Sequence, residues 1–228
     1  RRDRFLADVV LEGTGEEAVA YCVNPGRMEA FSCNGARVWL SPAEVRAPPA
    51  AGEAAVKAPK GRRLAWTWEL IEHEGVLCGT NTQRPNAIVR ALLERRLLPG
   101  LSDWTRLVPE ASLEGWHGAD GQELAATGTS AASDDPGKLP TAPHSSRLDF
   151  WLQGPHGETF IEVKNCHTVY PDGNGYFPDS ISLRASRHVQ ALAKLAARGC
   201  SALALFVVQR EDLRGAVRPS EHHDPAFA

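Results

Sequence analysis

Hydrophobic and polar residues alternate over short stretches in the first part of the chain. Two such runs, residues 5–11 and 18–22, are separated by the polar segment 13–17, which contains two glycines. Alternation with a period of two is typical of a strand with one buried face, and a polar, glycine-containing break predicts a hairpin. Further short runs follow at residues 37–41, 64–71 and 76–80. Several short strands without a long helix predict a small β-barrel over residues 1–80.

The break between the first two runs has a second interpretation. Residues 13–18 match the GxGxxA pattern of a dinucleotide-binding loop. Such a loop is followed by a full amphipathic helix, whereas Pro25-Gly26 comes soon afterwards in this chain. Proline followed by glycine interrupts a helix and leaves room for only about two turns. We therefore favour the hairpin.

A different pattern begins after residue 80. Residues 87–98 carry apolar side chains at helical spacing, and Pro99-Gly100 is expected to end that helix. The elements that follow are a hairpin, a helix and a last strand, predicted at residues 147–153, 159–165, 183–198 and 202–208. A hairpin followed by a helix and a strand indicates a mixed sheet. We expect an α/β (α+β) protein with two domains, residues 1–80 and 81–228.

Two segments lack any periodic pattern. Residues 42–63 are rich in Ala, Pro, Gly, Lys and Arg, and residues 115–143 are rich in Gly, Ala, Ser, Thr and Asp. Segments of this composition bury too little apolar surface to pack into a core. We expect the first to be a surface insert and the second to be a mobile one.

Composition narrows the class of protein. The chain has 228 residues, of which 43% are hydrophobic, and it has no apolar run of membrane-spanning length, so no membrane association is expected. Its five cysteines show no CxxC pair, which argues against a disulfide framework or structural zinc. A reducing, intracellular compartment fits best, either the cytoplasm or nucleoid or, after removal of a transit peptide, an organelle. The net charge of −3 means that any basic face has to be local.

Candidate chemistry lies on the hairpin of the second domain. A turn centred after Pro155 would place Asp149 opposite Glu162 and Arg147 opposite Lys164. Because side chains alternate along a strand, these four would share one face, directed to a cleft or to solvent. The opposite face would point to the core with Leu148, Phe150, Leu152, Ile161 and Val163.

Two directly opposed carboxylates repel each other by up to about 1 kcal/mol. A divalent cation between them removes that cost. Asp149, Glu162 and the backbone carbonyl of Val163 would supply the hard oxygen ligands that suit Mg²⁺ or Mn²⁺. Lys164 would then orient or deprotonate an attacking water and stabilise charge on a phosphate. The alternative is a solvated hairpin that carries two cross-strand ion pairs.

Five stretches together resemble the sugar fermentation stimulation protein A (SfsA) family. In chain order they are Arg4–Asp8, Cys22–Met28, Ser146–Phe150, Ile161–Lys164 and Asn174–Ser180. The resemblance implies DNA binding, an OB-like amino-terminal barrel and a restriction-endonuclease-like carboxy-terminal domain. The PD-(D/E)xK signature of that domain falls on Asp149, Glu162 and Lys164, the residues that the hairpin register also selects.

The chain departs from the family pattern at three places. Val23 stands where the family typically has Pro. The family helix after Asn81-Thr82 carries an acidic residue where this chain has Ala91, so Glu94 or Glu110 would have to replace it. A helix and strand that follow Asp224-Pro225 in the family are absent, so a truncated carboxy terminus is expected. Residues 222–224, with two histidines and an aspartate, could bind a metal, but a polar tail is favoured.

Several basic residues are candidates for binding DNA. Arg184, Arg187 and His188 lie near the start of a predicted helix, where phosphate binds well, and the resemblance favours Arg184 and His188. Alternatively, Asp179 or Ser182 simply caps that helix. On the hairpin, Arg147 is a further candidate. The barrel offers Arg4, Asn24 and Arg27 at family-like positions, with Trp39 or Trp66 for base stacking or for the core.

The sequence therefore predicts a DNA-binding protein with a phosphodiesterase site that uses Mg²⁺ or Mn²⁺. One alternative is a non-catalytic DNA-binding regulator, linked to sugar metabolism, in which the carboxylate site is vestigial. Another is an RNA-processing or repair factor, since barrels that bind single strands accept either polymer. Metal binding separates the first two interpretations.

Overall fold

The computed structural model describes residues 5–24, 26, 28, 33–43, 64–113 and 147–228. The chain forms two compact units. The first comprises Arg1–Gln83 and Gln209–Arg214, and the second comprises Arg84–Val208 and Gly215–Ala228. The segments 42–63 and 115–143, for which inserts were predicted, lie largely outside the described residues. Among the described helices, none has both the length and the apolar character needed to span a bilayer.

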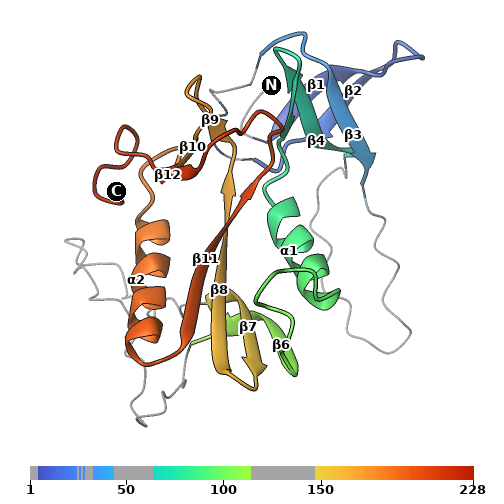
Figure 1. The fold of residues 1–228 in the computed structure, drawn as a ribbon. Helices are drawn as coiled ribbons and strands as arrows, with labels where there is room; N and C mark the ends of the chain where they lie inside the picture. Colours follow the sequence, from blue (N-terminus) through green and yellow to red (C-terminus); the bar gives the residue numbers. More distant parts are fainter. Residues whose placement is uncertain (1–4, 25, 27, 29–32, 44–63, 114–146) are drawn as a thin grey trace, which may run out of the picture. The chain divides into compact units, whose positions relative to one another are not determined.

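The first unit contains a five-stranded sheet. Its strands are β1 (Leu6–Val10), β2 (Glu17–Tyr21), β3 (Val38–Pro42), β4 (Trp66–His73) and β5 (Val76–Gly79). They follow the order β1-β2-β4-β3, with β5 paired to β4 (Figure 1). Strands β1 and β2 are antiparallel, as the predicted hairpin requires. Gly13 and Gly15 in the turn have φ of 93° and 71°, a conformation that glycine adopts without strain. The prediction of a hairpin is therefore confirmed, and the alternative, a dinucleotide-binding loop, is not what this segment forms.

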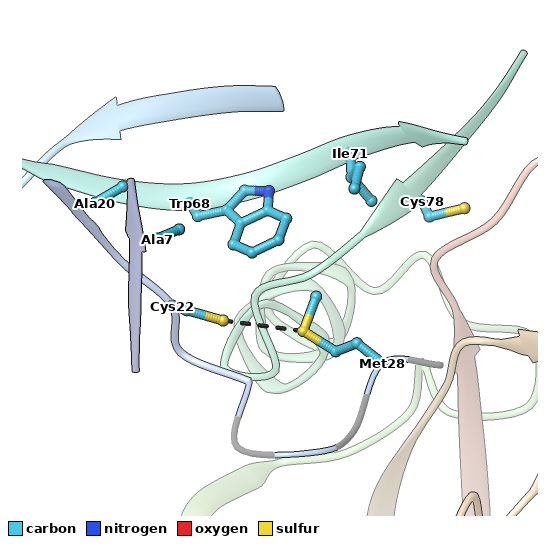
Figure 2. Close-up of a cluster of buried hydrophobic side chains, with 7 residues drawn as sticks. All are labelled: Ala7, Ala20, Cys22, Met28, Trp68, Ile71 and Cys78. Atoms are coloured by element: carbon cyan, nitrogen blue, oxygen red, sulfur yellow. Dashed lines mark hydrogen bonds between the residues drawn. The ribbon is translucent and has the colours of Figure 1, made fainter. Parts of the chain in front are cut away.

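The core of this unit is small and mixed in composition. Figure 2 shows Trp68 beside the strand residues Ala7 and Ala20, with the Sγ atom of Cys22 3.9 Å from the Sδ atom of Met28. Ile71 and Cys78 complete the buried cluster. Trp68 and Ile71 of β4 are three residues apart, so the alternation of β4 is broken between them, where the pairing with β3 shifts register.

The segment Gln209–Arg214 joins this unit from the far end of the chain. The N–H of Gly79 donates to the carbonyl of Gln209 at 2.7 Å, and the backbones of Cys78 and Arg210 form an isolated antiparallel β-bridge. A Cβ atom on residue 79 would lie 2.5 Å from the Cβ of Gln209. Only glycine therefore allows the two backbones to approach this closely.

The second unit is built on a four-stranded sheet of order β11-β8-β7-β6. The strands are β6 (Arg106–Ser112), β7 (Arg147–Gly154), β8 (Gly157–Cys166) and β11 (Ser201–Val208). The β8–β11 pair is parallel and the other pairs are antiparallel. A smaller sheet contains β9 (Thr168–Val169), β10 (Gly175–Phe177) and β12 (Val217–Pro219). With its two helices, this unit gives the mixed α/β fold that the sequence predicts.

The helices cover opposite faces of the four-stranded sheet. Helix α1 (Arg84–Glu94) packs Val89 and Leu93 against Phe150, Leu152, Ile161 and Val163. Helix α2 (Leu183–Ala197) packs Ala191, Leu192 and Leu195 against Leu113, Leu148 and Phe160. Figure 1 draws α1 and α2 on either side of β8. Strand β8 is therefore buried on both faces.

Two details of the sequence prediction are corrected here. Leu148 was expected on the same face as Phe150, but it packs in the α2 cluster. The described β7–β8 ladder ends at the pair Phe150–Ile161, and the β6–β7 ladder omits Glu110, whose φ is 50°. Alternation with a period of two holds only in a regular strand, so it fails beyond this irregularity.

The first helix also begins earlier than the predicted residue 87. Asn81 Oδ1 accepts a hydrogen bond from the N–H of Gln83 at 3.0 Å, and Pro85 occupies the first turn. The hydrogen bond to Asn81 closes a turn immediately before the helix, and proline is favourable in a first turn because its fixed φ suits a helix. The helix ends at Glu94, shortly before Arg96, which has φ of 56°.

Helix α1 offers a matched test of this packing. Leu93 is fully buried, whereas Ile88 on the same helix is 42% exposed. Leu93→Ala should lower the free energy of unfolding by about 2–5 kcal/mol, because it removes buried methyl groups and leaves a cavity. Ile88→Ala should change it by no more than about 0.5 kcal/mol. Urea unfolding of both variants measures the difference, and equal effects would contradict the packing of α1 described here.

Candidate active site

Strand β8 brings together the charged residues that the sequence singles out. Glu162 and Lys164 lie two residues apart on β8, so they point to the same face. His188 reaches them from α2, and Asp149 lies near the start of β7. Glu162 is only 4% exposed, so this is a buried charged cluster in the middle of the second unit.

Asp149 is held by two neutral donors. Its Oδ1 accepts from the side-chain amide of Asn86 at 2.7 Å, and its Oδ2 accepts from the backbone N–H of Val163 at 2.7 Å. The predicted register holds from Phe150–Ile161 to Gly154–Gly157. Beyond Phe150–Ile161, the N–H of Val163 donates to the Asp149 side chain. The direct pairs expected for Asp149 with Glu162 and for Arg147 with Lys164 are therefore not part of the described ladder.

Glu162 is held by Lys164 and His188 on one of its two oxygens. Lys164 Nζ donates to Oε1 at 2.6 Å, and His188 Nδ1 contacts the same oxygen. The Lys164 Nζ and His188 Nδ1 atoms are 3.4 Å apart. The other oxygen, Oε2, is buried and has no hydrogen-bond partner among the described residues. A buried carboxylate oxygen without a partner is costly and marks a place where a further ligand fits.

The two carboxyl groups are shifted in opposite directions. Burial and then the negative charge of Glu162 raise the pKa of Asp149 above its ordinary value of 3.8, against the hydrogen bonds from Val163 and Asn86. Burial alone would also raise the pKa of Glu162, but the contacts with His188 and Lys164 lower it below 4.5. Pairs of acids whose environments separate their pKa values are characteristic of functional sites.

This arrangement can be tested for its fit to a divalent metal ion. In the described part of the chain, no group of three or more His, Cys, Asp or Glu side chains is arranged to hold an ion. Mg²⁺ and Mn²⁺, however, are commonly bound by one or two carboxylates, with water completing the shell. Asp149 and Glu162, with the unpartnered Oε2 oxygen, fit that smaller ligand set, and Val163, whose carbonyl is a further candidate ligand, directly follows Glu162 in the sequence.

The other predicted DNA-binding residues fall in different environments. Arg4 and Arg27 lie outside the described residues. Asn24 is 2% exposed in the first unit, and its Oδ1 accepts from the N–H of Gly26 at 2.8 Å, so its side chain holds a turn. In the second unit, Arg147 and Arg184 are exposed. Contacts between these residues and DNA stay predictions.

The two tryptophans proposed for stacking lie on strands of the first unit. Trp39 of β3 is 37% exposed, and Trp66 of β4 is half-buried. Trp66 packs against the buried cluster of that unit. The core role is thus the better account of Trp66, whereas the ring of Trp39 is accessible.

The missing acidic residue of α1 is not replaced as the sequence suggested. Glu94 forms an ion pair with Arg90 at 2.8 Å and is 48% exposed, and Glu110 is exposed on β6. Asn86 is the residue of α1 that contacts Asp149. Sequence reasoning missed it because the helix was expected to start at residue 87, which left Asn86 outside it.

The start of α2 is capped by the adjacent Ser182, which is in turn held by a residue distant in the sequence, Asp224. The Oγ atom of Ser182 accepts from the N–H of Ala185 at 3.2 Å, and Asp224 Oδ2 accepts from the N–H of Ser182 at 2.9 Å. Asp179 lies 3.1 Å from His167 Nε2, and this contact lowers the pKa of Asp179. Ser182 is therefore the cap. Asp224 is 3% exposed and hydrogen-bonded to Ser182. Residues 222–224 were expected to form a polar tail, and for Asp224 this expectation is wrong.

Comparison with known proteins agrees with this architecture. The family description "SfsA N-terminal OB domain" matches residues 1–80, and "Sugar fermentation stimulation protein RE domain" matches residues 130–228. The chain belongs to the sugar fermentation stimulation protein (SfsA) family. The resemblance seen in the sequence is confirmed.

Relatives cover the whole chain. A sugar fermentation stimulation protein homolog of Chromohalobacter salexigens is 36% identical over 100% of this chain and 74% of its own length. A homolog of Ruegeria pomeroyi is 32% identical over 100% of this chain and 80% of its own length. The solved structure of Pyrococcus furiosus SfsA in complex with Ca²⁺ shares the fold, with a TM-score of 0.67 at 20% identity, covering 99% of this chain and 76% of that one.

The opposite pKa shifts predict opposite effects on stability. Asp149→Asn removes a disfavoured charge but also one of the two acceptor oxygens, so its clear signature is the pH dependence: relative to the wild type, the variant should gain about 0.5–2 kcal/mol in the free energy of unfolding as the pH rises through the raised pKa of Asp149. The folded-state pKa of Asp149 is raised, so its cost to the wild type is present above that pKa and disappears as the pH falls through it. The gain from the variant should disappear with it in urea unfolding at lower pH.

Glu162→Gln is the matched comparison. Because the folded-state pKa of Glu162 is lowered, its charge stabilises the fold at pH values above the ordinary 4.5, and that contribution is lost as the pH falls through the folded pKa. The variant should therefore lose about 1–3 kcal/mol at about pH 7, since Lys164 and His188 lose their partner. A gain in stability for both variants would contradict the described electrostatics.

Proposed function

We propose that this protein binds DNA and hydrolyses phosphodiester bonds with the help of a divalent metal ion. The observation that carries the proposal is a pair of carboxylates, the half-buried Asp149 and the buried Glu162 beside Lys164, with one Glu162 oxygen unpartnered among the described residues. The residue types and order match the PD-(D/E)xK signature. The Pyrococcus furiosus relative was solved with Ca²⁺, which prefers the same oxygen ligands.

Asp149, Glu162 and the Val163 carbonyl would hold Mg²⁺ or Mn²⁺. The bound ion would supply Lewis acidity and lower the pKa of a bound water. Asn86 and the Val163 N–H orient the Asp149 carboxylate through bonds of 2.7 Å each. This leaves a second lone pair on each Asp149 oxygen for another partner.

Lys164 is placed for a separate task. Its Nζ atom lies 2.6 Å from Glu162 Oε1 and 3.4 Å from His188 Nδ1, and its side chain is 11% exposed. A cation held in a partly desolvated site can orient an attacking water and stabilise charge that develops on a phosphate. His188 holds Glu162 from the other side and fixes its orientation.

A non-catalytic DNA-binding regulator is the second candidate. It is favoured by one observation: α1 presents the neutral amide of Asn86 to Asp149, while the acidic residue of the family pattern is Ala91 here. A site with one carboxylate fewer would bind an ion more weakly. Metal affinity and cleavage together separate the two candidates.

The first test is metal binding. Mn²⁺ titrated into the protein in a calorimeter should bind, and the double variant Asp149→Asn/Glu162→Gln should lose that binding, because both carboxylates are removed. Loss of such ligands is expected to weaken binding by at least about 10–100-fold. Glu94→Gln, which changes an exposed carboxylate on α1, is the control and should leave the titration unchanged. A titration that is the same in the double variant and the wild type would refute the site.

The second test separates enzyme from regulator at Lys164. Lys164→Met should keep the fold, the Mn²⁺ affinity and most of the DNA affinity, while Mn²⁺-dependent cleavage of DNA should fall by about 10²–10⁴-fold. Single-turnover cleavage rates on single- and double-stranded DNA measure this, with circular dichroism as the check on folding. A wild-type protein that binds Mn²⁺ and DNA but cuts neither substrate would exclude the nuclease and leave the regulator.

A further inference from the structure

Helix α2 concentrates positive charge in a chain whose net charge is −3. Its sequence includes Arg184, Arg187, His188 and Lys194 and contains neither Asp nor Glu. Helix α1 of the same unit instead pairs Arg90 with Glu94 at 2.8 Å. The charge of α2 is thus a local property that the net charge of the chain conceals.

Three of these cations lie along one flank of the helix, here called the basic flank: Arg184, Arg187 and Lys194. Arg187 and Lys194 are seven residues apart, which is close to two helical turns, and Arg184 lies one turn before Arg187. Arg187 and Lys194 point away from the buried Leu192. Arg184 lies seven residues before the buried Ala191, so it shares that angular position, but it is exposed in the first turn of the helix. At 1.5 Å per residue, the basic flank is about 15 Å long.

The cations of the basic flank are exposed, and no counter-charge is paired with them in the part of the chain that the structure describes. Among the described residues, none of the three takes part in an ion pair, whereas the buried Lys164 is paired with Glu162. Like charges three or four residues apart weaken a helix slightly. An uncompensated row of this kind lowers helix stability and favours an anionic partner that spans several charges.

The basic flank begins next to the candidate active site. His188 follows Arg187 directly and contacts Glu162. The start of the helix is already capped by Ser182, so a phosphate would be bound here by side chains more than by free backbone N–H groups. A polyanion that extends from the site along α2 would meet Arg184, Arg187 and then Lys194.

We propose that the basic flank of α2 binds the phosphate backbone of duplex DNA next to the phosphate that enters the candidate active site. This inference rests on the proposed function, which it extends by naming the surface that holds the substrate. Each strand of a duplex carries one phosphate per about 3.4 Å of axis, so a surface of about 15 Å spans about four of them. Phosphate contacts carry no sequence information, so binding here should be insensitive to sequence.

The test is the salt dependence of DNA binding by the double variant Arg187→Gln/Lys194→Gln. Affinity is measured by fluorescence anisotropy for two duplexes of unrelated sequence, in EDTA, so that the result does not depend on the metal. Loss of two phosphate contacts should weaken binding to both duplexes and reduce the slope of log K against log salt by about 1.8. Arg95→Gln/Arg218→Gln removes two exposed cations of the same unit that lie off α2, and is the matched control.

The outcomes are distinct. A reduced slope in the α2 variant with an unchanged slope in the control supports the proposal. Equal slopes in the α2 variant and the wild type, equal losses in both variants, or a loss confined to one duplex would each overturn it. A wild-type protein that does not bind DNA at all would remove both this inference and the proposed DNA binding. Failure to bind Mn²⁺ would refute only the metal site, since this assay contains none.

Discussion

The burial of Glu162 on the central strand of a sheet is the constraint around which the second unit is organised. Strand β8 is paired on both edges and covered by a helix on each face, so water is largely excluded from its side chains. A carboxylate in such a place is stable only with partners of opposite charge. Lys164 comes from the same strand, but His188 comes from α2. The docking of α2 therefore serves the hydrophobic core and the charged site at once.

The two carboxylates of the site are stabilised in different ways, and this difference has chemical meaning. Glu162 is paired with the Lys164 ammonium group and contacts His188, whereas Asp149 is bound by an amide and a backbone N–H, which orient it without compensating its charge. Under the proposed function, this uncompensated charge of Asp149 is what would attract a metal ion. Interactions that neutralised it would make the fold more stable and would also weaken ion binding, which is the usual conflict between stability and function.

Local regularity decided how much of this could be predicted from the sequence. The hairpin register around Pro155 was predictable, because a short turn and an alternating pattern fix the pairing of Phe150 with Ile161. Leu148 was misplaced where the neighbouring strand becomes irregular, and Asn86 was missed because the start of the helix was misjudged. The hydrogen bond from the N–H of Ser182, the cap of α2, to Asp224 joins residues about forty positions apart, and no local pattern carries such information.

The return of Gln209–Arg214 to the first unit has a consequence for the order in which the protein is made. Residues up to Gln83 leave the ribosome early, but the backbone partner of Gly79 is Gln209, more than a hundred residues later. The amino-terminal sheet therefore cannot complete its hydrogen bonding while it is the only part synthesised. The contacts of this sheet with Gln209–Arg214 can form only after β11 has been synthesised. Contacts between residues distant in sequence are also slow to form, so these contacts come last. An isolated fragment ending at Gln83 would keep this edge permanently unpaired.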